Sequence, residues 1–436
     1  MRLVNHIDKI FWTAADKLLY VIYGFIFLVQ ISMLNPDDFA LFSFLLAINT
    51  WIFIISDSFS LQLIIQFGFN DDYEKNANFY ALVFHLIITI GLSCILFLLS
   101  NQISYILNES RLKEILIYLP LLSILMIPRT YFGKFLLKKH SMQKIFWMDF
   151  FFFFTMSVLI IYFKLNSNKL DLQLSINIYF LGTLLSSIYA TLSSIRYCKI
   201  DLKGRLPLKK VLKFNVPFTI SNALANLPKQ LDILIFKLFF DLHTIGIYQA
   251  AKSLYRLFEE GVSGANGLVY PALVKHFETK NYNEIYSIVS KGISFLFIAY
   301  VFVSIILLSG FSNFLISNIM KSNYLNSIDY FNILLIGAIF LPLNILNFLL
   351  TSTENHIKLL LNVSIAFLLS IITMYFVGFY NLNILIPFGL ISYNFTLAVL
   401  NYLYVKKHIL PNFKLINLLR GFNDTKEFSK RFLNKL

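Results

Sequence analysis

The amino-acid sequence predicts an all-α integral membrane protein with about twelve transmembrane helices in two pseudo-symmetric six-helix bundles. Three observations predict this fold: the composition, the spacing of the apolar runs and a weak internal repeat. Of the 436 residues, 58% are hydrophobic and 14% are charged, and the mean hydropathy is +0.70. Average soluble proteins have about 45–50% apolar and about 25% charged residues. Lipid is therefore the expected solvent for most of this chain.

Apolar runs long enough to cross a bilayer recur along the whole chain, each with room for a span of roughly 20 residues. The twelve runs cover residues 10–33, 38–66, 79–100, 115–135, 145–164, 173–195, 211–239, 243–274, 287–309, 328–352, 357–377 and 383–404. The two longest runs, 38–66 and 243–274, predict helices that tilt or extend beyond the bilayer. The first run is long and has no A-x-A-like exit, so we expect it to remain as an uncleaved first span.

Basic residues gather in short segments between these runs, and the net charge is +14. They follow the fourth, sixth and eighth runs and are frequent in the C-terminal tail. If each run crosses the membrane once, all of these segments lie on the same side. The positive-inside rule makes that side the cytoplasm, so we expect both termini there. The acidic loop with Asp71, Asp72 and Glu74 is the exception, but acidic residues count little in this rule. A nucleic-acid binder would instead need one contiguous basic face.

A faint repeat divides the chain into two halves of six spans. Residues 35–42 (NPDDFALF) and 241–248 (DLHTIGIY) both read as an acidic or amide turn followed by apolar residues around one small residue. Both turns are predicted to open a long helix, and the halves should be related by an axis along the membrane normal. We therefore predict one bundle over residues 1–205, a second over 206–404 and a basic cytoplasmic tail over 405–436. The tail is either an amphipathic segment on anionic lipid or a partly ordered, solvated segment.

The stretch from 209 to 276 carries polar residues on two predicted spans. Charges at bilayer depth are costly, so they normally face a bundle interior or a water-filled cavity. On the eighth span, Lys252 and Arg256 are one helical turn apart and can face one anion such as a diphosphate. Glu259 and Glu260 follow at helical spacing, and Glu260 can hold Arg256 when the site is empty. The alternative is that these charges pair with each other or lie near the cytoplasmic end.

On the seventh span, Asn222, Asn226, Lys229 and Asp232 share one helical face. Lys229 is a candidate contact for phosphate, and the two amides are candidates for sugar hydroxyls. Asp232 can pair with a cation or take a proton. Its alternative role is that of a structural partner for Lys229 or another lysine, because intramembrane charges usually pair.

The first half offers fewer candidates. Lys17 is the candidate cation for the anion site, although its position near the chain's start also fits a lysine that reaches the interface. Asp16 and Asp57, together with Asp232 and Glu259, are candidate proton or sodium groups or charge partners. Arg129, Lys134 and Asp149 are expected to be interface anchors beside the basic loop, and His85 to be a packed histidine.

No cofactor, metal site or ATP-binding motif is predicted. The two cysteines, Cys94 and Cys198, suggest no disulfide, and there is no Cys/His cluster with the spacing of a metal site. No GxxxxGK[ST] stretch occurs, so any transport must be driven by an ion gradient, the membrane potential or the product gradient.

These residues resemble a known family. Asn222 and Asp232, the segment 245–251 (IGIYQAA), Tyr270-Pro271, the turn 36–42 and the Ser56-Asp57 interruption resemble the Wzx-type O-antigen and capsule flippases. These belong to the multidrug/oligosaccharidyl-lipid/polysaccharide (MOP) exporter superfamily. The motifs are short, and Ala40 stands where a glycine is typical, a change that still permits close packing.

The resemblance implies a MATE-like fold in which two six-helix bundles enclose a V-shaped cavity. It further implies a non-enzymatic flippase in the bacterial inner membrane, moving undecaprenyl-diphosphate-linked oligosaccharide to the periplasmic leaflet by alternating access. Expected partners are that glycan lipid, membrane lipid, H⁺ or Na⁺, and other glycan-assembly membrane proteins, with no nucleic acid. Two alternatives stay open: a cation-coupled multidrug exporter of the same fold, and a membrane glycan polymerase or ligase.

Overall fold

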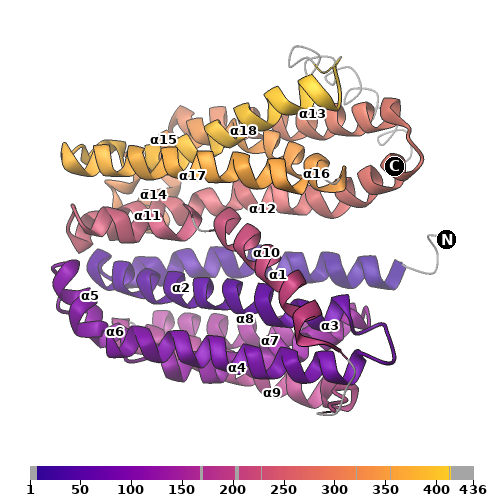
Figure 1. Cartoon of the computed structure of the whole chain (residues 1–436). Coiled ribbons are helices and arrows are strands. Elements are labelled where there is room, and N and C mark those ends of the chain that lie inside the picture. Colours follow the sequence, from indigo (N-terminus) through magenta and orange to yellow (C-terminus); the bar gives the residue numbers. More distant parts are fainter. Residues whose placement is uncertain are drawn as a thin grey trace. The chain divides into compact units, whose positions relative to one another are not determined.

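The computed structural model describes residues 7–166, 170–201, 206–226, 228–320, 322–353, 355–411 and 413. The side chains at positions 7–10, 221, 225, 228, 229, 266–268, 271, 278 and 356 lie outside the described part. Within these ranges every regular element is a helix (Figure 1). The chain forms two compact units, Met1–Gly246 and Ile247–Leu436, and the boundary falls inside one long helix. The predicted boundary at residue 205 rests on the sequence repeat and stays a prediction.

The first unit contains the predicted spans one to seven. Its helices are α1 (Ile7–Met33), α2 (Pro36–Ser56), α3 (Gln62–Gln66), α4 (Glu74–Leu98), α5 (Ser100–Ile106), α6 (Leu112–Leu116), α7 (Leu119–Lys138), α8 (Met142–Leu165), α9 (Leu172–Ser194), α10 (Leu208–Asn226), α11 (Pro228–Lys237) and the start of α12 (Leu242–Glu278). A π-helical turn, η2 (Asp57–Leu61), joins α2 to α3, and a 3₁₀ turn, η3 (Ile195–Tyr197), follows α9. Helix α8 packs closely against α1 and α9, and α7 packs against α4 and α9.

The second unit contains the rest of α12 and the last four predicted spans. Its helices are α13 (Tyr282–Ile306), α14 (Ser312–Ile319), α15 (Ser327–Ala338), α16 (Ile345–Ser352), α17 (His356–Phe379) and α18 (Phe388–His408). Short turns connect them: η4 (Leu307–Phe311), η5 (Ser322–Tyr324), η6 (Leu341–Asn344) and η7 (Asn383–Leu385). Helix α18 packs against α15, α16 and α17. Nearly all of the predicted tail lies outside the described residues.

All twelve predicted segments are helical, as the apolar runs predicted. Among the described residues, nine helices are long and apolar enough to cross a membrane, and ten if α15 and α16, bent by 49°, form one span. Neither α10–α11 nor α12 is among them, and these are the segments with the polar residues singled out above. Large apolar side chains remain exposed along α4, α8, α9 and α17, as expected of surfaces that face lipid. The count of twelve crossings stays a prediction.

The two repeated turns each begin a long helix, as predicted. The Asn35 side chain accepts a hydrogen bond from the backbone N–H of Asp38 at 2.8 Å, which caps α2. Asp241 accepts one from the N–H of Thr244 at 2.9 Å at the start of α12. The second turn needs a small residue for a steric reason. A Cβ on Gly246 would lie 1.9 Å from the carbonyl oxygen of Pro36, too close for any larger side chain.

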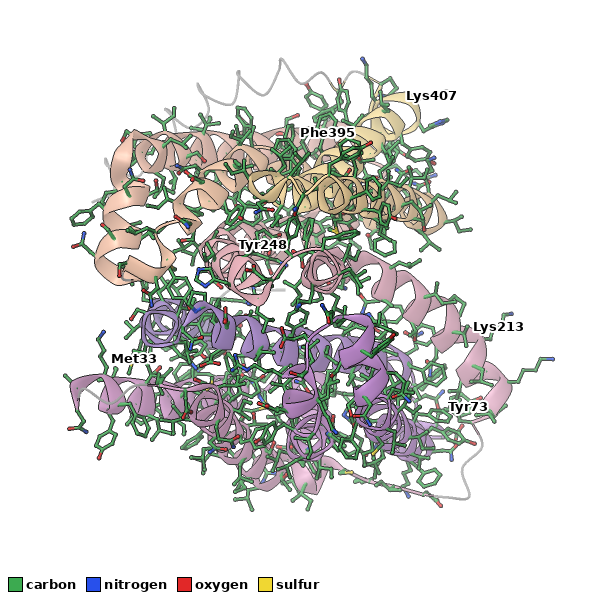
Figure 2. All side chains as sticks on the ribbon, turned by 90° about the vertical axis from the view of Figure 1, so that its left-hand side faces the viewer. Met33, Tyr73, Lys213, Tyr248, Phe395 and Lys407 are labelled. Carbon is green, nitrogen blue, oxygen red and sulfur yellow. The ribbon has the colours of Figure 1, made fainter. Side chains whose placement is uncertain are left out.

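Side chains fill the interior of each unit, while basic ones extend outward (Figure 2). Lys213 on α10 and Lys407 on α18 project away from the ribbon, and both are exposed. Tyr248 on α12 is fully buried and meets the ring of Tyr330 edge-on, with centroids 6.1 Å apart. The exposed lysines belong to the two basic segments that the positive-inside rule assigns to the cytoplasm.

Candidate functional site

The seventh predicted span is held against the second span. It is described as two helices, α10, which contains Pro217, and α11, on either side of residue 227, which lies outside the described part of the structure. Its Asn215 amide donates to the backbone oxygen of Phe59 in η2. Asn222 donates to the hydroxyl of Ser58, one residue earlier in the same turn, at 2.5 Å. A π-helical turn shifts the usual backbone bonding by one residue, and such turns are frequent at functional sites.

Some residues of the polar face predicted on this span already form hydrogen bonds within the first unit. Asn226 donates to the backbone oxygen of Asn222 at 2.9 Å and to its side-chain oxygen at 3.2 Å. Asp232 is fully buried, and its carboxylate accepts from the N–H of Ile233 at 2.9 Å. The side chain of Lys229 lies outside the described part of the structure. The two asparagines are therefore brought together, and the predicted contact of Lys229 with phosphate stays a prediction.

Helix α12 carries all the polar residues predicted for the eighth span, so their helical spacing is preserved. Lys252 is only 3% exposed, and its ammonium lies 6.0 Å from the ring centroid of Tyr248. Arg256 and Glu260 are exposed, and Glu259 is half-buried. Lys252 and Arg256 are thus one helical turn apart but differ in exposure, and their predicted contact with one anion stays a prediction.

Asp57 is already neutralised within the first unit. The Lys134 ammonium lies 2.8 Å from one of its carboxylate oxygens and 3.0 Å from the other. Gln62 also donates to Asp57, at 3.1 Å. The sequence suggested that Lys134 is an interface anchor. In the structure its ammonium instead pairs with Asp57 in the π-helical turn of the second span.

Three charged residues meet between α1, α7 and α8. The Arg129 guanidinium donates to Asp149 at 2.6 Å and lies over the ring of Phe152, 4.1 Å from its centroid. Asp16 on α1 lies beside the Asp149 carboxyl. Oδ1 of Asp16 is buried and has no hydrogen-bond partner among the described residues.

The expectation that Arg129 and Asp149 are interface anchors is wrong. Their side chains are 12% and 8% exposed and pair with each other inside the first unit. The available signal was that opposite charges stand in two neighbouring apolar runs, because charges within such runs usually pair. Lys17, by contrast, is exposed beside this cluster, with its ammonium 5.1 Å from the ring centroid of Tyr20.

His85 is a packed histidine, as predicted. It is fully buried, and its ring nitrogens lie 2.6 Å from the Ser56 hydroxyl and 2.8 Å from that of Thr130. Groups of three or more His, Cys, Asp or Glu arranged for a metal ion are not found among the described residues.

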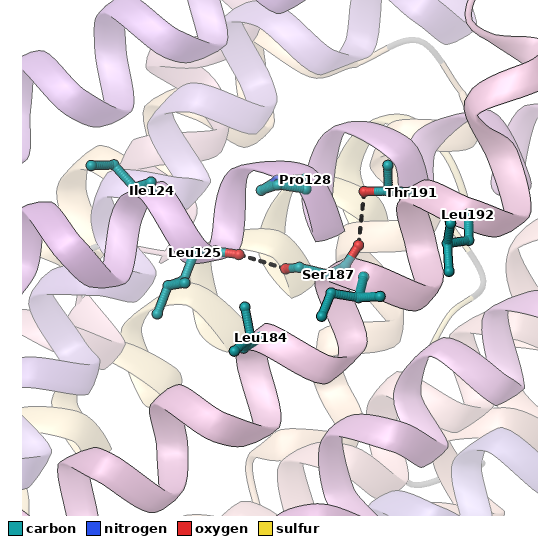
Figure 3. A pocket seen from close by; sticks show the side chains of 8 residues that line it. Ile124, Leu125, Pro128, Leu184, Ser187, Thr191 and Leu192 are labelled. Atoms are coloured by element: carbon teal, nitrogen blue, oxygen red, sulfur yellow. Dashed lines mark hydrogen bonds between the residues drawn. The ribbon is translucent and has the colours of Figure 1, made fainter.

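A groove of about 260 Å³ lies between α7 and α9 beside Pro128 (Figure 3). Ser187 donates to the backbone oxygen of Leu125, next to the turn that the proline disrupts, and Thr191 donates to the oxygen of Ser187 at 2.8 Å. These hydroxyls satisfy backbone groups around a proline within a membrane span. The other lining side chains are aliphatic, so the groove offers nothing to a charged head group.

Residues 7–277 match the family model for polysaccharide biosynthesis proteins. No curated protein matches the chain.

Solved structures resemble the chain along nearly its whole length. An inward-facing multidrug resistance MATE family transporter of the MOP superfamily has a TM-score of 0.72 at 13% identity, covering 89% of this chain and 94% of its own. The lipid II flippase MurJ, in an inward closed conformation, has a TM-score of 0.73 at 13% identity, covering 98% and 93%. A MOP superfamily transporter from Pyrococcus furiosus has a TM-score of 0.58 at 14% identity, covering 91% and 93%. At these identities the likeness establishes the fold, which confirms the predicted MATE-like class.

Proposed function

We propose that this chain, which belongs to the polysaccharide biosynthesis protein family, is a MOP-type flippase that moves an undecaprenyl-diphosphate-linked oligosaccharide across the bacterial inner membrane. The proposed cargo is an O-antigen or capsule repeat unit, and the direction is from the cytoplasmic to the periplasmic leaflet. The observation that carries the proposal is the family match over residues 7–277, which includes the cations Lys252 and Arg256 of α12.

The charges on α12 support an anionic cargo. A diphosphate presents several oxygens to its protein partner, and an arginine fork with a lysine point charge suits them. We propose that Lys252 and Arg256, one helical turn apart on α12, form this pair, and that Asn222 and Asn226 on α10 exchange their present hydrogen bonds for sugar hydroxyls. Lys17 and Lys229 are further proposed cation contacts. An exporter of organic cations would instead gain from a site without such cations.

We propose that transport proceeds by alternating access between two bundles, with both termini in the cytoplasm. The head group enters a polar cavity while the polyprenyl tail stays in lipid. The protein performs no covalent step in this scheme.

We propose Asp16 as the first candidate for ion coupling, because its carboxyl lies beside that of Asp149 and its Oδ1 is buried without a hydrogen-bond partner among the described residues. Asp57 is a weaker candidate because Lys134 pairs with it at 2.8 Å, and removing either charge would leave the other uncompensated. Asp232 stays a candidate for ion coupling because its side chain is fully buried.

The test uses a bacterial strain that lacks its own flippase gene and depends on this protein for surface glycan. Arg256→Ala should reduce surface glycan at least about tenfold, because one charged hydrogen-bond pair is worth roughly 1.5–3 kcal/mol. Arg256→Lys should retain part of the activity. Lys275→Ala removes an exposed cation near the end of the same helix and serves as the matched control.

The outcomes separate the competing functions. Full export by both Arg256 variants would remove the anion-binding role. Restored resistance to organic cations without any surface glycan would instead identify a multidrug exporter. Accumulated lipid-linked repeat units in the inner leaflet of the Arg256→Ala strain, with normal synthesis, would distinguish a translocation defect from a polymerase or ligase defect.

A further inference from the structure

The connection between the sixth and seventh predicted spans is held against the start of α4. Residues 198–201, which we call the strap, follow η3 and belong to no helix. The side-chain amide of Asn78 on α4 donates to the backbone oxygen of Lys199 at 2.8 Å. The amide of Asn76 donates to the backbone oxygen of Asp201 at 3.4 Å. Side chains of α4 therefore bind the backbone of the strap at two points.

The two amides that hold the strap are deeply buried. Asn78 is 0% exposed and Asn76 is 2% exposed. Release of the strap would leave two buried donors without their acceptors, which costs more than the loss of a hydrogen bond at the surface. The backbone adds a third bond, because the N–H of Asp201 donates to the oxygen of Lys75 at 3.3 Å.

Cys198 connects the start of the strap to α7. Its sulfur lies 3.3 Å from the hydroxyl oxygen of Tyr131. That hydroxyl donates its single hydrogen to the backbone oxygen of Asn78 at 3.0 Å, so the thiol is the donor to Tyr131. Tyr131 thus contacts both the strap and one of the residues that hold it.

The chain beyond the strap packs against the same unit. Leu206 and Val211 are 2% and 0% exposed and belong to a hydrophobic cluster with residues of α3, α4 and α7. The ring of Phe214 on α10 meets that of Phe67 edge-on, with centroids 5.9 Å apart. The described chain on both sides of residues 202–205 is therefore tied to the first unit.

We propose that the strap fastens the connection between the two halves to the first unit, so that α10 moves with the first six spans during transport. A flexible linker would instead leave α10 free to move with the second half. Release of α10 would also expose the buried side chains of Leu206 and Val211 to water. The seventh span then belongs mechanically to the first bundle, although the sequence repeat assigns it to the second. The role in transport rests on the proposed function, whereas the docking of the strap does not.

The first experiment measures how often the strap leaves α4, with Cys198 as the reporter. The sequence has two cysteines, so Cys94→Ala leaves Cys198 as the only thiol. Burial raises the pKa of the Cys198 thiol, and a maleimide should therefore label the docked form slowly. The labelling rate of the purified protein in a mild detergent is compared with its rate after unfolding in SDS.

Substitution of the amides should accelerate labelling. Asn78→Ala should raise the rate about three- to tenfold, because the strap loses one hydrogen bond and its opened fraction grows. Asn76→Ala should act in the same direction but less, since its bond is longer, and it is the second variant in case Asn78→Ala does not fold. Asn101→Ala, at an exposed asparagine on α5, is the matched control and should stay within about twofold of the parent rate.

The second experiment measures whether α10 keeps a fixed distance from the first unit. Spin labels are attached at Lys213→Cys on α10 and Leu192→Cys on α9, which are both exposed positions. The native cysteines are removed by Cys94→Ala and Cys198→Ser. Double electron–electron resonance on the protein in liposomes should give one narrow distance distribution.

Three results would overturn the docking of the strap. The first is that Cys198 in the native protein is labelled as fast as in the unfolded protein. The second is that Asn78→Ala and Asn76→Ala leave the rate unchanged, or that Asn101→Ala accelerates it equally. The third is a distance distribution with several separate peaks.

Cross-linking tests the role in transport. Lys75→Cys and Asp201→Cys, in the protein without its native cysteines, place two thiols where the backbones are hydrogen-bonded. Dibromobimane, which joins neighbouring thiols, is added to cells that depend on this protein for surface glycan. The cross-linked protein should keep its surface glycan relative to the cysteine-free protein treated in the same way, because the strap stays docked throughout transport.

Loss of surface glycan on cross-linking would show that the strap must release, and would overturn its role in transport. If the parent protein itself produces no surface glycan, the proposed function fails and the transport role fails with it. The labelling and distance measurements use no glycan lipid, so they still decide whether the strap is docked.

Discussion

The two units pair buried polar side chains of different kinds. In the first unit, the Arg129 guanidinium donates to the Asp149 carboxylate at 2.6 Å, so the pair is charged. In the second unit, two fully buried amides form a neutral pair, in which Asn362 donates to Asn401 at 2.8 Å.

This difference decides what a substitution leaves behind. An arginine keeps its proton in a protein, so removing one member of the Arg129–Asp149 pair leaves an uncompensated buried charge. Removing one amide of the Asn362–Asn401 pair leaves only an unsatisfied polar group, which costs less.

The largest effect is expected from breaking the charged pair. Arg129→Ala leaves the Asp149 carboxylate buried without its cation, which should destabilise the protein by about 3–5 kcal/mol. Thermal unfolding of the purified protein in detergent measures this change. Arg129→Met combined with Asp149→Leu should recover most of the loss, because no buried charge then remains. Equal stability of the single variant and the parent protein would show that the pair is not buried as described.

A smaller effect is expected at two glycines of α12. Gly246 lies in the part of this helix that belongs to the first unit, and Gly264 in the part that belongs to the second. Gly246→Ala places a Cβ against the Pro36 carbonyl and should cost roughly 1–3 kcal/mol through overpacking. Gly264→Ala meets open space and should stabilise the helix by about 0.5–1 kcal/mol. Both values come from the same unfolding measurement, and the same sign for both changes would contradict the described packing.

The hydrogen bond between α10 and the π-helical turn should contribute less. Asn222→Ala removes a 2.5 Å bond to Ser58 and should cost about 1 kcal/mol. A double-mutant cycle with Ser58→Ala isolates this bond from the rest of the contact. If the two single changes add without coupling, the bond contributes nothing, and Asn222 is free to serve a ligand.

The smallest effect on stability is expected at Asp16. Asp16→Asn keeps the size and polarity of a half-buried side chain, so the free energy of unfolding should shift by less than about 1 kcal/mol. Export should lose its dependence on the pH gradient, measured as surface glycan with and without a protonophore. Glu260→Asn is the control for an exposed acid. Export that keeps its full pH dependence in Asp16→Asn would move the coupling role to another carboxyl.

The sequence was reliable for local features. The turns at Asn35 and Asp241 were predicted to open long helices, and both side chains cap a helix because capping depends on residues three apart. His85 was correctly expected to be packed. The anchors were misjudged: Arg129, Lys134 and Asp149 lie near a basic loop in the sequence, and sequence proximity does not show which opposite charge each will meet.

By itself, the sequence determined the membrane class, the helical segments and the polar faces of the seventh and eighth spans. These follow from composition and from periodicity within one helix, which are local properties of the chain. Only the tertiary structure decided how the acids are compensated. Asp57 and Lys134 are 77 residues apart, and the paired amides Asn362 and Asn401 are 39 apart. Such partners are set by helix packing, and no spacing along the chain encodes them.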